Sequence, residues 1–263
     1  MSPVTQPGPV RRRPVRDAIT VLRRESLPAL RSPIGLVFGM LQPLVFLALF
    51  GPLLTGMPGL PAESSWQWFV PAILLMLTLF GTAQGTGFGL QTELETGSFE
   101  RLAVTPMSRS AILVGRSLKD VVELVAQALL IIGLTMLLGF RLYPGGALLG
   151  LALLAVVGIG MGSLSSALAI ATRKSPETLY MVQSTLLFPL LFLSGMLLPL
   201  DMGPGWMEVV GRLNPLTYIV EASRSLFSGV VAEPVVLQGW VAAGALAALG
   251  LVLGTRGMRR VGG

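Results

Sequence analysis

The stretch LYPGGALLGLALLAVVGIGMGSLSSALAIAT, residues 142–172, has no charged side chain over 31 consecutive positions. A helix of about 20 apolar residues is long enough to cross the hydrocarbon core of a bilayer, which is about 30 Å thick. A charge-free stretch of this length therefore predicts a transmembrane helix rather than a buried helix of a soluble domain.

Four further stretches share this property, with lengths of 31, 29, 23 and 22 residues: 32–62, 64–92, 178–200 and 234–255. A sixth apolar stretch, 124–140, has only 17 residues, and it reaches full length when the charged turn before it is included. The sequence thus predicts an all-α membrane protein whose six transmembrane helices lie within residues 32–255.

The composition agrees with this fold class and excludes much chemistry. Charged residues make up 12% of the chain, against about 25% in an ordinary globular domain. The chain has no Cys and no His, so it lacks disulfides, thiolate nucleophiles and the usual general base and metal ligand. Since its basic residues flank the predicted spans, the net charge of +6 indicates membrane topology rather than nucleic-acid binding.

Basic residues gather on one side of the predicted spans. If the N-terminus is cytoplasmic, 16 of the 19 Lys and Arg residues lie on that side, and Arg141, Arg212 and Arg224 lie on the other. Because an excess of Lys and Arg in cytoplasmic loops sets the orientation of membrane proteins, we expect both termini in the cytoplasm. The first apolar run is about twice as long as a signal-peptide core, which predicts an uncleaved first span.

The residues that flank the spans divide into three segments. Residues 1–13 are rich in Pro and Arg, a composition typical of a disordered tail. In residues 14–31, Val15, Ala18 and Leu22 recur at helical spacing with arginines on other faces, which predicts an amphipathic helix on the membrane surface. Residues 256–263 form a basic cytoplasmic tail. Within the fourth span, Gly158, Gly160 and Gly162 favour close helix packing, either within one chain or at a dimer seam.

The cytoplasmic segment 91–110, QTELETGSFERLAVTPMSRS, is too patterned for a plain connection. Gly97 is expected to end the preceding helix, and Ser98 to cap a short new helix with Glu100 in its first turn. About twenty residues exceed what a simple helix connection needs. The segment is therefore interpreted as a docking surface, with an interfacial helix as the alternative.

The outer segment 201–233 predicts two short helices with a break between them. Asn214 followed by Pro215 is a helix N-cap with proline at the first helical position, and a first short helix is expected over residues 206–213. Neither helix is long enough to span the membrane. We expect them to dip into the outer interface or to close a path, with Glu221 and Arg224 as charged tips; capping of the bundle is the alternative.

A charged stripe opens the third span, where four ionisable residues and Gln127 share one helical face: Arg116, Lys119, Asp120 and Glu123. Arg116 with Asp120, and Lys119 with Glu123, are i,i+4 pairs that neutralise one another. Ionisable residues inside a span are candidates for function. Both a structural role and a role in a transport path remain open for this stripe.

If the protein uses energy, that energy is expected to come from a partner and not from this chain. The central portions of the other five spans have no ionisable residue, whereas ion-driven transporters generally use such groups at mid-depth. The only lysines, Lys119 and Lys174, do not follow a Gly-rich turn, so no P-loop is present.

Two motifs carry a resemblance to a known family. The run ELETGSFERLAVTPMSRSAILVGR (93–116) and the run NPLTYIVEASRSLFSG (214–229) resemble the signatures of type-2 ABC-transporter permeases, in particular the daunorubicin/doxorubicin-resistance-type exporters. The resemblance implies six spans, an N-terminal amphipathic helix, a coupling helix and outer re-entrant helices. The coupling residues carried over to this chain are Glu93, Glu95, Gly97, Ser98, Glu100 and Arg101, and those of the outer gate are Asn214, Pro215, Tyr218, Glu221 and Arg224.

The resemblance also implies partners and a location. It implies a subunit of a bacterial cytoplasmic (inner) membrane exporter that moves a hydrophobic or amphipathic, drug-like substrate out of the cell. Two copies of a separate ATPase hold ATP and Mg²⁺, and a second permease subunit, identical or not, completes the transporter; this chain binds no cofactor or metal and is not itself an enzyme. Export of a lipid or of lipid-linked polysaccharide is the alternative. A secondary transporter, a channel and an integral-membrane enzyme are more remote readings.

Overall fold

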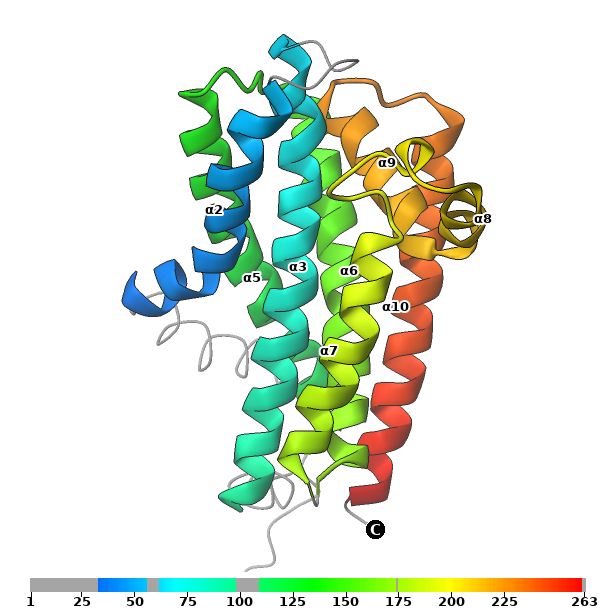
Figure 1. Ribbon diagram of the computed structural model, residues 1–263. Helices are drawn as coiled ribbons and strands as arrows, with labels where there is room; N and C mark the ends of the chain where they lie inside the picture. Colours follow the sequence, from blue (N-terminus) through cyan, green and yellow to red (C-terminus); the bar gives the residue numbers. More distant parts are fainter. Residues whose placement is uncertain (1–32, 56–61, 98–108, 174, 262–263) are drawn as a thin grey trace, which may run out of the picture.

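The computed structural model describes residues 33–55, 62–97, 109–173 and 175–261. Within these ranges the chain is helical and has no β-strand, which confirms the all-α prediction there. The bundle is built from α2 (Pro33–Thr55), α3 (Ala62–Glu95), α5 (Arg109–Met136), α6 (Pro144–Ala171), α7 (Pro176–Phe192) and α10 (Pro234–Val261) (Figure 1). Between α7 and α10 lie η1 (Leu200–Met202), α8 (Gly205–Leu213) and α9 (Pro215–Phe227).

Three helices in the described part of the chain are long and apolar enough to cross a membrane. They occupy Ser65–Glu95, Pro144–Ala171 and Pro234–Met258, and α2 contributes a shorter apolar stretch, Gly39–Leu53. The chain thus has the character of a membrane protein. The count of six spans stays a prediction.

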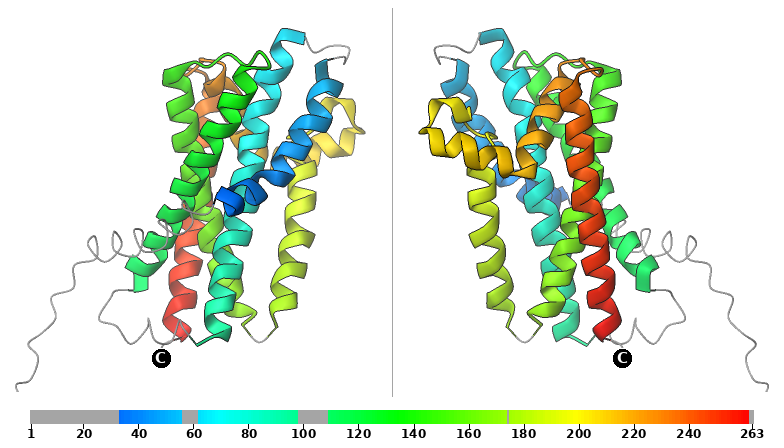
Figure 2. Two further views of the ribbon diagram at one scale, coloured as in Figure 1. Left: turned by 90° about the vertical axis from the view of Figure 1, so that its left-hand side faces the viewer. Right: turned by 90° about the vertical axis from the view of Figure 1, so that its right-hand side faces the viewer.

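The helices α3, α6 and α10 run along the length of the bundle, between its two ends (Figures 1 and 2). We call the end where α3, α6 and α10 terminate the inner end, and the end that carries α8 and α9 the outer end, following the orientation expected from the sequence. At the outer end, α8 projects from the side of the bundle in both views of Figure 2. The N-terminal tail (1–13), the amphipathic segment (14–31) and residues 98–108 of the cytoplasmic segment lie outside the described residues.

Prolines and glycines set the helix limits. The helices α2, α6, α7, α9 and α10 each begin at a proline, a residue that the first turn tolerates because its missing N–H has no partner there. Gly97 has a φ of +67° and follows the end of α3, as predicted. However, α3 stays helical through Glu95, so the first part of the cytoplasmic segment is a continuation of the span.

The fifth predicted span is shorter than the hydropathy suggested. The apolar run continues to residue 200, but α7 ends at Phe192 after 17 residues. Pro189 lies in its last turn, and Gly195 adopts a φ of +69°, a conformation that favours glycine. The chain therefore turns back toward the bundle before it forms η1 and α8.

The core is formed around α3 and by the close contact of α6 with α10. Side chains of α3 from Phe69 to Leu77 are almost fully buried. At Gly160 of α6, an added Cβ would lie 2.9 Å from the backbone of Ala247 in α10, so only glycine permits this approach. This finding supports the packing of small residues within one chain as the role of Gly160.

Candidate functional site

The charged stripe of α5 is brought into the bundle rather than left at its surface. Arg116 and Asp120 are only 4% and 6% exposed, while Lys119 and Glu123 are partly exposed. Lys119 Nζ lies 3.4 Å from Glu123 Oε2, which confirms that i,i+4 pair, and 3.5 Å from Asp120 Oδ1. The stripe is therefore a connected network and not a row of solvated charges.

Arg116 forms an ion pair with Glu93 of α3. The i,i+4 spacing had predicted Asp120 as its partner, which is wrong: Asp120 pairs with Lys119 and accepts a hydrogen bond from Thr86 Oγ1. Glu93 lies in the last turn of α3, where the helix dipole disfavours an acidic residue. The guanidinium of Arg116 offsets that cost and joins α3 to α5.

Asp120 lies where three helices meet. Thr86 contributes from α3, and Gly162 of α6 faces the carboxylate from the other side. A Cβ built at Gly162 would lie 3.2 Å from Asp120 Oδ2 and 3.3 Å from Thr86 Oγ1. Glycine at this position thus leaves the space that the carboxylate and its hydroxyl donor occupy.

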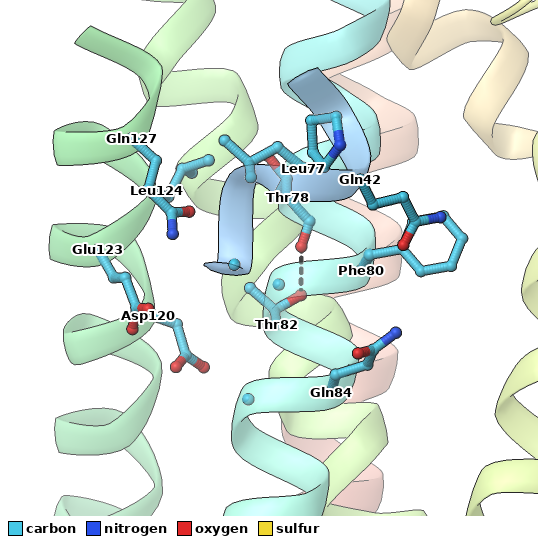
Figure 3. Close-up of a pocket in the computed structure, with 14 residues that line it drawn as sticks. Gln42, Leu77, Thr78, Phe80, Thr82, Gln84, Asp120, Glu123, Leu124 and Gln127 are labelled. Carbon is cyan, nitrogen blue, oxygen red and sulfur yellow. Dashed lines mark hydrogen bonds between the residues drawn. The ribbon is translucent and has the colours of Figure 1, made fainter. Parts of the chain in front are cut away.

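A small polar cavity of about 230 Å³ adjoins this network between α2, α3 and α5. Figure 3 shows its polar wall, and Thr82 Oγ1 donates a 2.7 Å hydrogen bond to the carbonyl of Thr78 within it. The labelled polar side chains are Gln42, Thr78, Thr82, Gln84, Asp120, Glu123 and Gln127. With carboxylates, amides and hydroxyls in its wall, the cavity can accommodate a polar or positively charged group.

Sequence reasoning found only part of this site. The α5 residues were identified by their charge and spacing, whereas Gln42, Thr86 and Gln84 are uncharged residues of α2 and α3. Polar residues inside otherwise apolar spans were the available signal for them. No group of three or more possible metal ligands occurs among the described residues.

The predicted coupling residues fall into two groups. Glu93 and Glu95 form the inner end of α3, and Gly97 follows directly. Ser98, Glu100 and Arg101 lie outside the described residues, so the short helix expected there stays a prediction. Because α3 and α5 flank residues 98–108, the Glu93–Arg116 pair joins the two helices from which that segment emerges.

At the outer end, the two short helices form as the sequence predicted. The Asn214 side chain caps α9 by accepting a 3.0 Å hydrogen bond from the N–H of Leu216, and its Nδ2 donates to the carbonyl of Leu190 at 2.8 Å. Pro215 follows as the first helical residue. Tyr218 Oη donates to the carbonyl of Arg212 at 2.8 Å, so α8 and α9 are tied together across the break.

The apolar side chains of α8 point away from the bundle. Trp206, Val209 and Leu213 are 59%, 63% and 82% exposed, and they recur at helical spacing on one face. A helix with this exposed face is suited to the membrane interface. This placement agrees with the expectation that the outer segment dips into the outer interface.

Arg224 is not the charged tip that the sequence suggested, whereas Glu221 is exposed. Arg224 Nε donates to the carbonyl of Trp68 at 3.0 Å, and its NH2 group donates to the carbonyls of Gly195 and Met196 at 2.9 and 3.3 Å. Its Cζ also lies 3.7 Å from the centroid of the Trp68 ring. This arginine clamp joins α9 to α3 and to the turn after α7.

Comparisons with known proteins agree with the resemblance of the two motifs. The family model described as "ABC-2 type transporter" matches residues 16–228. The chain is 30% identical over 223 residues to the daunorubicin resistance ABC transporter permease protein DrrB1 of Streptomyces coeruleorubidus, covering 84% of this chain and 78% of that protein.

Two further relatives have similar coverage. A putative transport permease, ycf38, of Cyanophora paradoxa is 34% identical, and the match covers 81% of this chain and 75% of that protein. A probable doxorubicin resistance ABC transporter permease protein, DrrC, of Mycobacterium tuberculosis (strain ATCC 25618 / H37Rv) is 25% identical, with coverages of 78% and 75%. The match over most of the chain, together with the long apolar helices, shows that this protein belongs to the ABC-2 type transporter family of membrane permeases.

Proposed function

We propose that the chain is the membrane subunit of an ATP-driven exporter that moves a hydrophobic or amphipathic, drug-like compound out of a bacterial cell. Two copies of a separate ATPase supply the energy, and a second copy of this chain completes the transporter as a homodimer. Six spans put both termini on the same side of the membrane, and the excess of Lys and Arg on that side assigns it to the cytoplasm. The names of the relatives, which refer to daunorubicin and doxorubicin resistance, support the substrate class.

The observation that carries this proposal is the pair between Glu93 and Arg116. It joins the last turn of α3 to α5, on either side of the segment that resembles a coupling helix. A displacement of that segment by an ATPase therefore moves the two helices together. Arg116 is buried and Glu93 is about one-third exposed, so water screens the pair less than a fully exposed surface pair.

The same charged network connects the movement of α3 and α5 to the polar cavity. Asp120 and Glu123 line the cavity and lie one and two turns beyond Arg116 on α5. A shift of α5 relative to α3 thus changes the position of the carboxylates in the cavity wall. A cavity of about 230 Å³ has room for a polar group of an amphipathic substrate, while the apolar part remains in the bilayer or at the partner subunit.

The decisive experiment measures ATP-dependent uptake of doxorubicin into inverted membrane vesicles that contain the chain with and without its ATPase. Uptake is expected only when both proteins and ATP are present. Substitution of Glu95 and Glu100 by Lys is expected to reduce ATPase association while the protein still inserts. Uptake that persists without an ATPase would contradict the proposal, and uptake that the double variant leaves unchanged would show that segment 91–110 is only an interfacial helix.

A charge exchange tests the linking pair itself. Glu93→Lys alone is expected to reduce uptake, and the exchange Glu93→Lys with Arg116→Glu to restore part of it. The matched control is the exchange Glu208→Lys with Arg212→Glu in α8, an exposed i,i+4 pair with an N–O distance of 2.6 Å. If the control exchange reduces uptake as much as Glu93→Lys does, the inner pair has no special part in transport.

The orientation has its own test, since the chain is free of cysteine. Single substitutions Leu60→Cys and Gly203→Cys are expected to react with an impermeant thiol reagent in intact cells. Ser98→Cys is expected to react only after the membrane is opened. The reverse pattern would invert the proposed topology.

A further inference from the structure

A second, larger cavity lies on another side of the bundle and has no part in the proposed coupling. It measures about 1160 Å³ and opens between the inner halves of α6 and α10 and most of α7. We call it the α6–α10 groove. Its wall is mostly apolar along its length, with Leu164, Leu186, Leu190, Leu246 and Leu253 among the lining residues.

The inner end of the groove has a different chemistry. Arg173, two residues beyond the end of α6, and Arg256, near the end of α10, both line it. The hydroxyl-bearing residues Thr172, Ser175 and Thr178 join them there. The groove therefore changes along its axis from a cationic, hydroxyl-rich end to an apolar body.

The two arginines are available for a ligand. Both are exposed, and within the described residues no ion pair is made by either of them. The acidic residue nearest to Arg173 in sequence, Glu177, is also exposed, and it forms no ion pair with any of the described residues. Two guanidinium groups at one end of an apolar groove complement an anionic headgroup with acyl chains.

A polar contact closes the groove on the side that faces the core of the bundle. Gln183 Nε2 donates to the carbonyl of Ala83 at 3.1 Å and to Ser165 Oγ at 2.6 Å, and Ser165 Oγ donates to the same carbonyl at 2.6 Å. This contact joins α3, α6 and α7 behind the groove. An occupant therefore enters from the surrounding bilayer and not from the polar cavity beside α5.

We propose that the α6–α10 groove binds one anionic phospholipid of the leaflet at the inner end, with its phosphate between Arg173 and Arg256 and an acyl chain along the leucines. The assignment of this leaflet to the cytoplasmic side rests on the orientation given under the proposed function. A bound lipid fills the space that α7 leaves against α10, and so supports α7 in the position that carries the outer segment.

The test uses purified full-length chain in vesicles and needs neither ATPase nor substrate. A fluorophore is attached to Leu253→Cys, within the groove, or to Leu237→Cys, on α10 outside it; these leucines are 40% and 69% exposed. Quenching is compared between nitroxide-labelled phosphatidylglycerol and nitroxide-labelled phosphatidylcholine, each present in both leaflets. At position 253 the anionic lipid is expected to be preferred by at least about fivefold, the effect of one basic residue near a charged membrane surface.

At position 253, the ratio of quenching by phosphatidylglycerol to quenching by phosphatidylcholine is expected to fall to about one in the variant Arg173→Gln with Arg256→Gln. The preference is expected to persist in the control Arg212→Gln. At position 237 no preference is expected in any variant. An equal preference at both positions would show attraction to the whole surface and overturn the proposal. Quenching by neither lipid at position 253, as when a second copy of the chain covers the groove, would overturn it too. Because transport is not measured, either failure leaves the proposed function intact.

Discussion

The two ends of the bundle are held together by different interactions. At the outer end, Arg224 donates to three backbone carbonyls and stacks on Trp68. At the inner end, α3 and α5 are joined by charged side chains, with Glu93 paired to Arg116 and Lys119 bridging Asp120 and Glu123. Carbonyls freed by the end of a helix are fixed in space, whereas charged side chains can exchange partners.

The difference indicates a division of roles. The outer clamp compensates for the early end of α7, where the carbonyls of Gly195 and Met196 have left the helix, and it holds α9 in one position. The inner network has two positive and three negative side chains, so several pairings are possible as α3 and α5 move. We therefore expect loss of the Arg224 clamp to lower stability most, and changes to the inner charges to lower stability less while also affecting coupling.

The largest effect is expected from Arg224→Ala. A buried carbonyl left without a donor costs about 1–3 kcal/mol, so loss of the Arg224 donors to the carbonyls of Gly195 and Met196 and of the contact with Trp68 is expected to lower stability by several kcal/mol. The measurements are the melting temperature in detergent and the abundance in membranes. Arg212→Ala, which removes an exposed ion pair of α8, is the control and is expected to change stability by less than about 1 kcal/mol. Similar losses in both variants would show that the Arg224 clamp stabilises the outer end no more than an exposed ion pair does.

The next effect is expected at the inner end, from Glu93→Gln. The neutral side chain leaves the charge of buried Arg116 less compensated. Since Glu93 is about one-third exposed, we expect about 2 kcal/mol, below the 3–5 kcal/mol typical of a fully buried pair. Arg116→Gln is expected to cost less, because water can reach Glu93. Thermal unfolding of the two single variants and the double variant measures the coupling energy; equal single-variant losses would contradict this asymmetry.

Asn214→Ala weakens the outer end by a smaller amount. It removes the cap of α9 and the hydrogen bond to the carbonyl of Leu190, and a lost cap costs about 0.5–2 kcal/mol. Such a change shifts a local equilibrium without unfolding the bundle. We expect lower export, or ATP turnover that depends less on substrate, at normal abundance and ATPase binding. A parallel fall in abundance would show that the segment is a structural cap, and unchanged export together with unchanged stimulation of ATP turnover by substrate would remove the gating role.

The sequence predicted the parts of this fold that depend on local chemistry. Proline at helix starts, glycine after α3 and the Asn214 cap each act within one turn of the chain, so their effect is visible in the local sequence. The partner of Arg116 could not be predicted from the local sequence, because a contact between α3 and α5 depends on how the helices pack. Arg224 was misassigned for a related reason: two of the three carbonyls that it contacts, those of Gly195 and Met196, become available only when α7 ends at Phe192, before its apolar run does.

The smallest effect sharpens the account of the inner network. Gly162→Ala places a methyl group against Asp120 and Thr86, where 3.2–3.3 Å is tighter than ordinary packing, and such overpacking costs about 1–3 kcal/mol. The higher helix propensity of Ala returns up to about 1 kcal/mol, so a net loss of about 1 kcal/mol is expected. Gly81→Ala in α3 is the matched control, since nothing lies within 4 Å of its added Cβ, and it is expected to be neutral or stabilising. If unfolding measurements show Gly162→Ala to be as stable as Gly81→Ala, Asp120 is free to move away, and α6 does not constrain the network that joins α3 to α5.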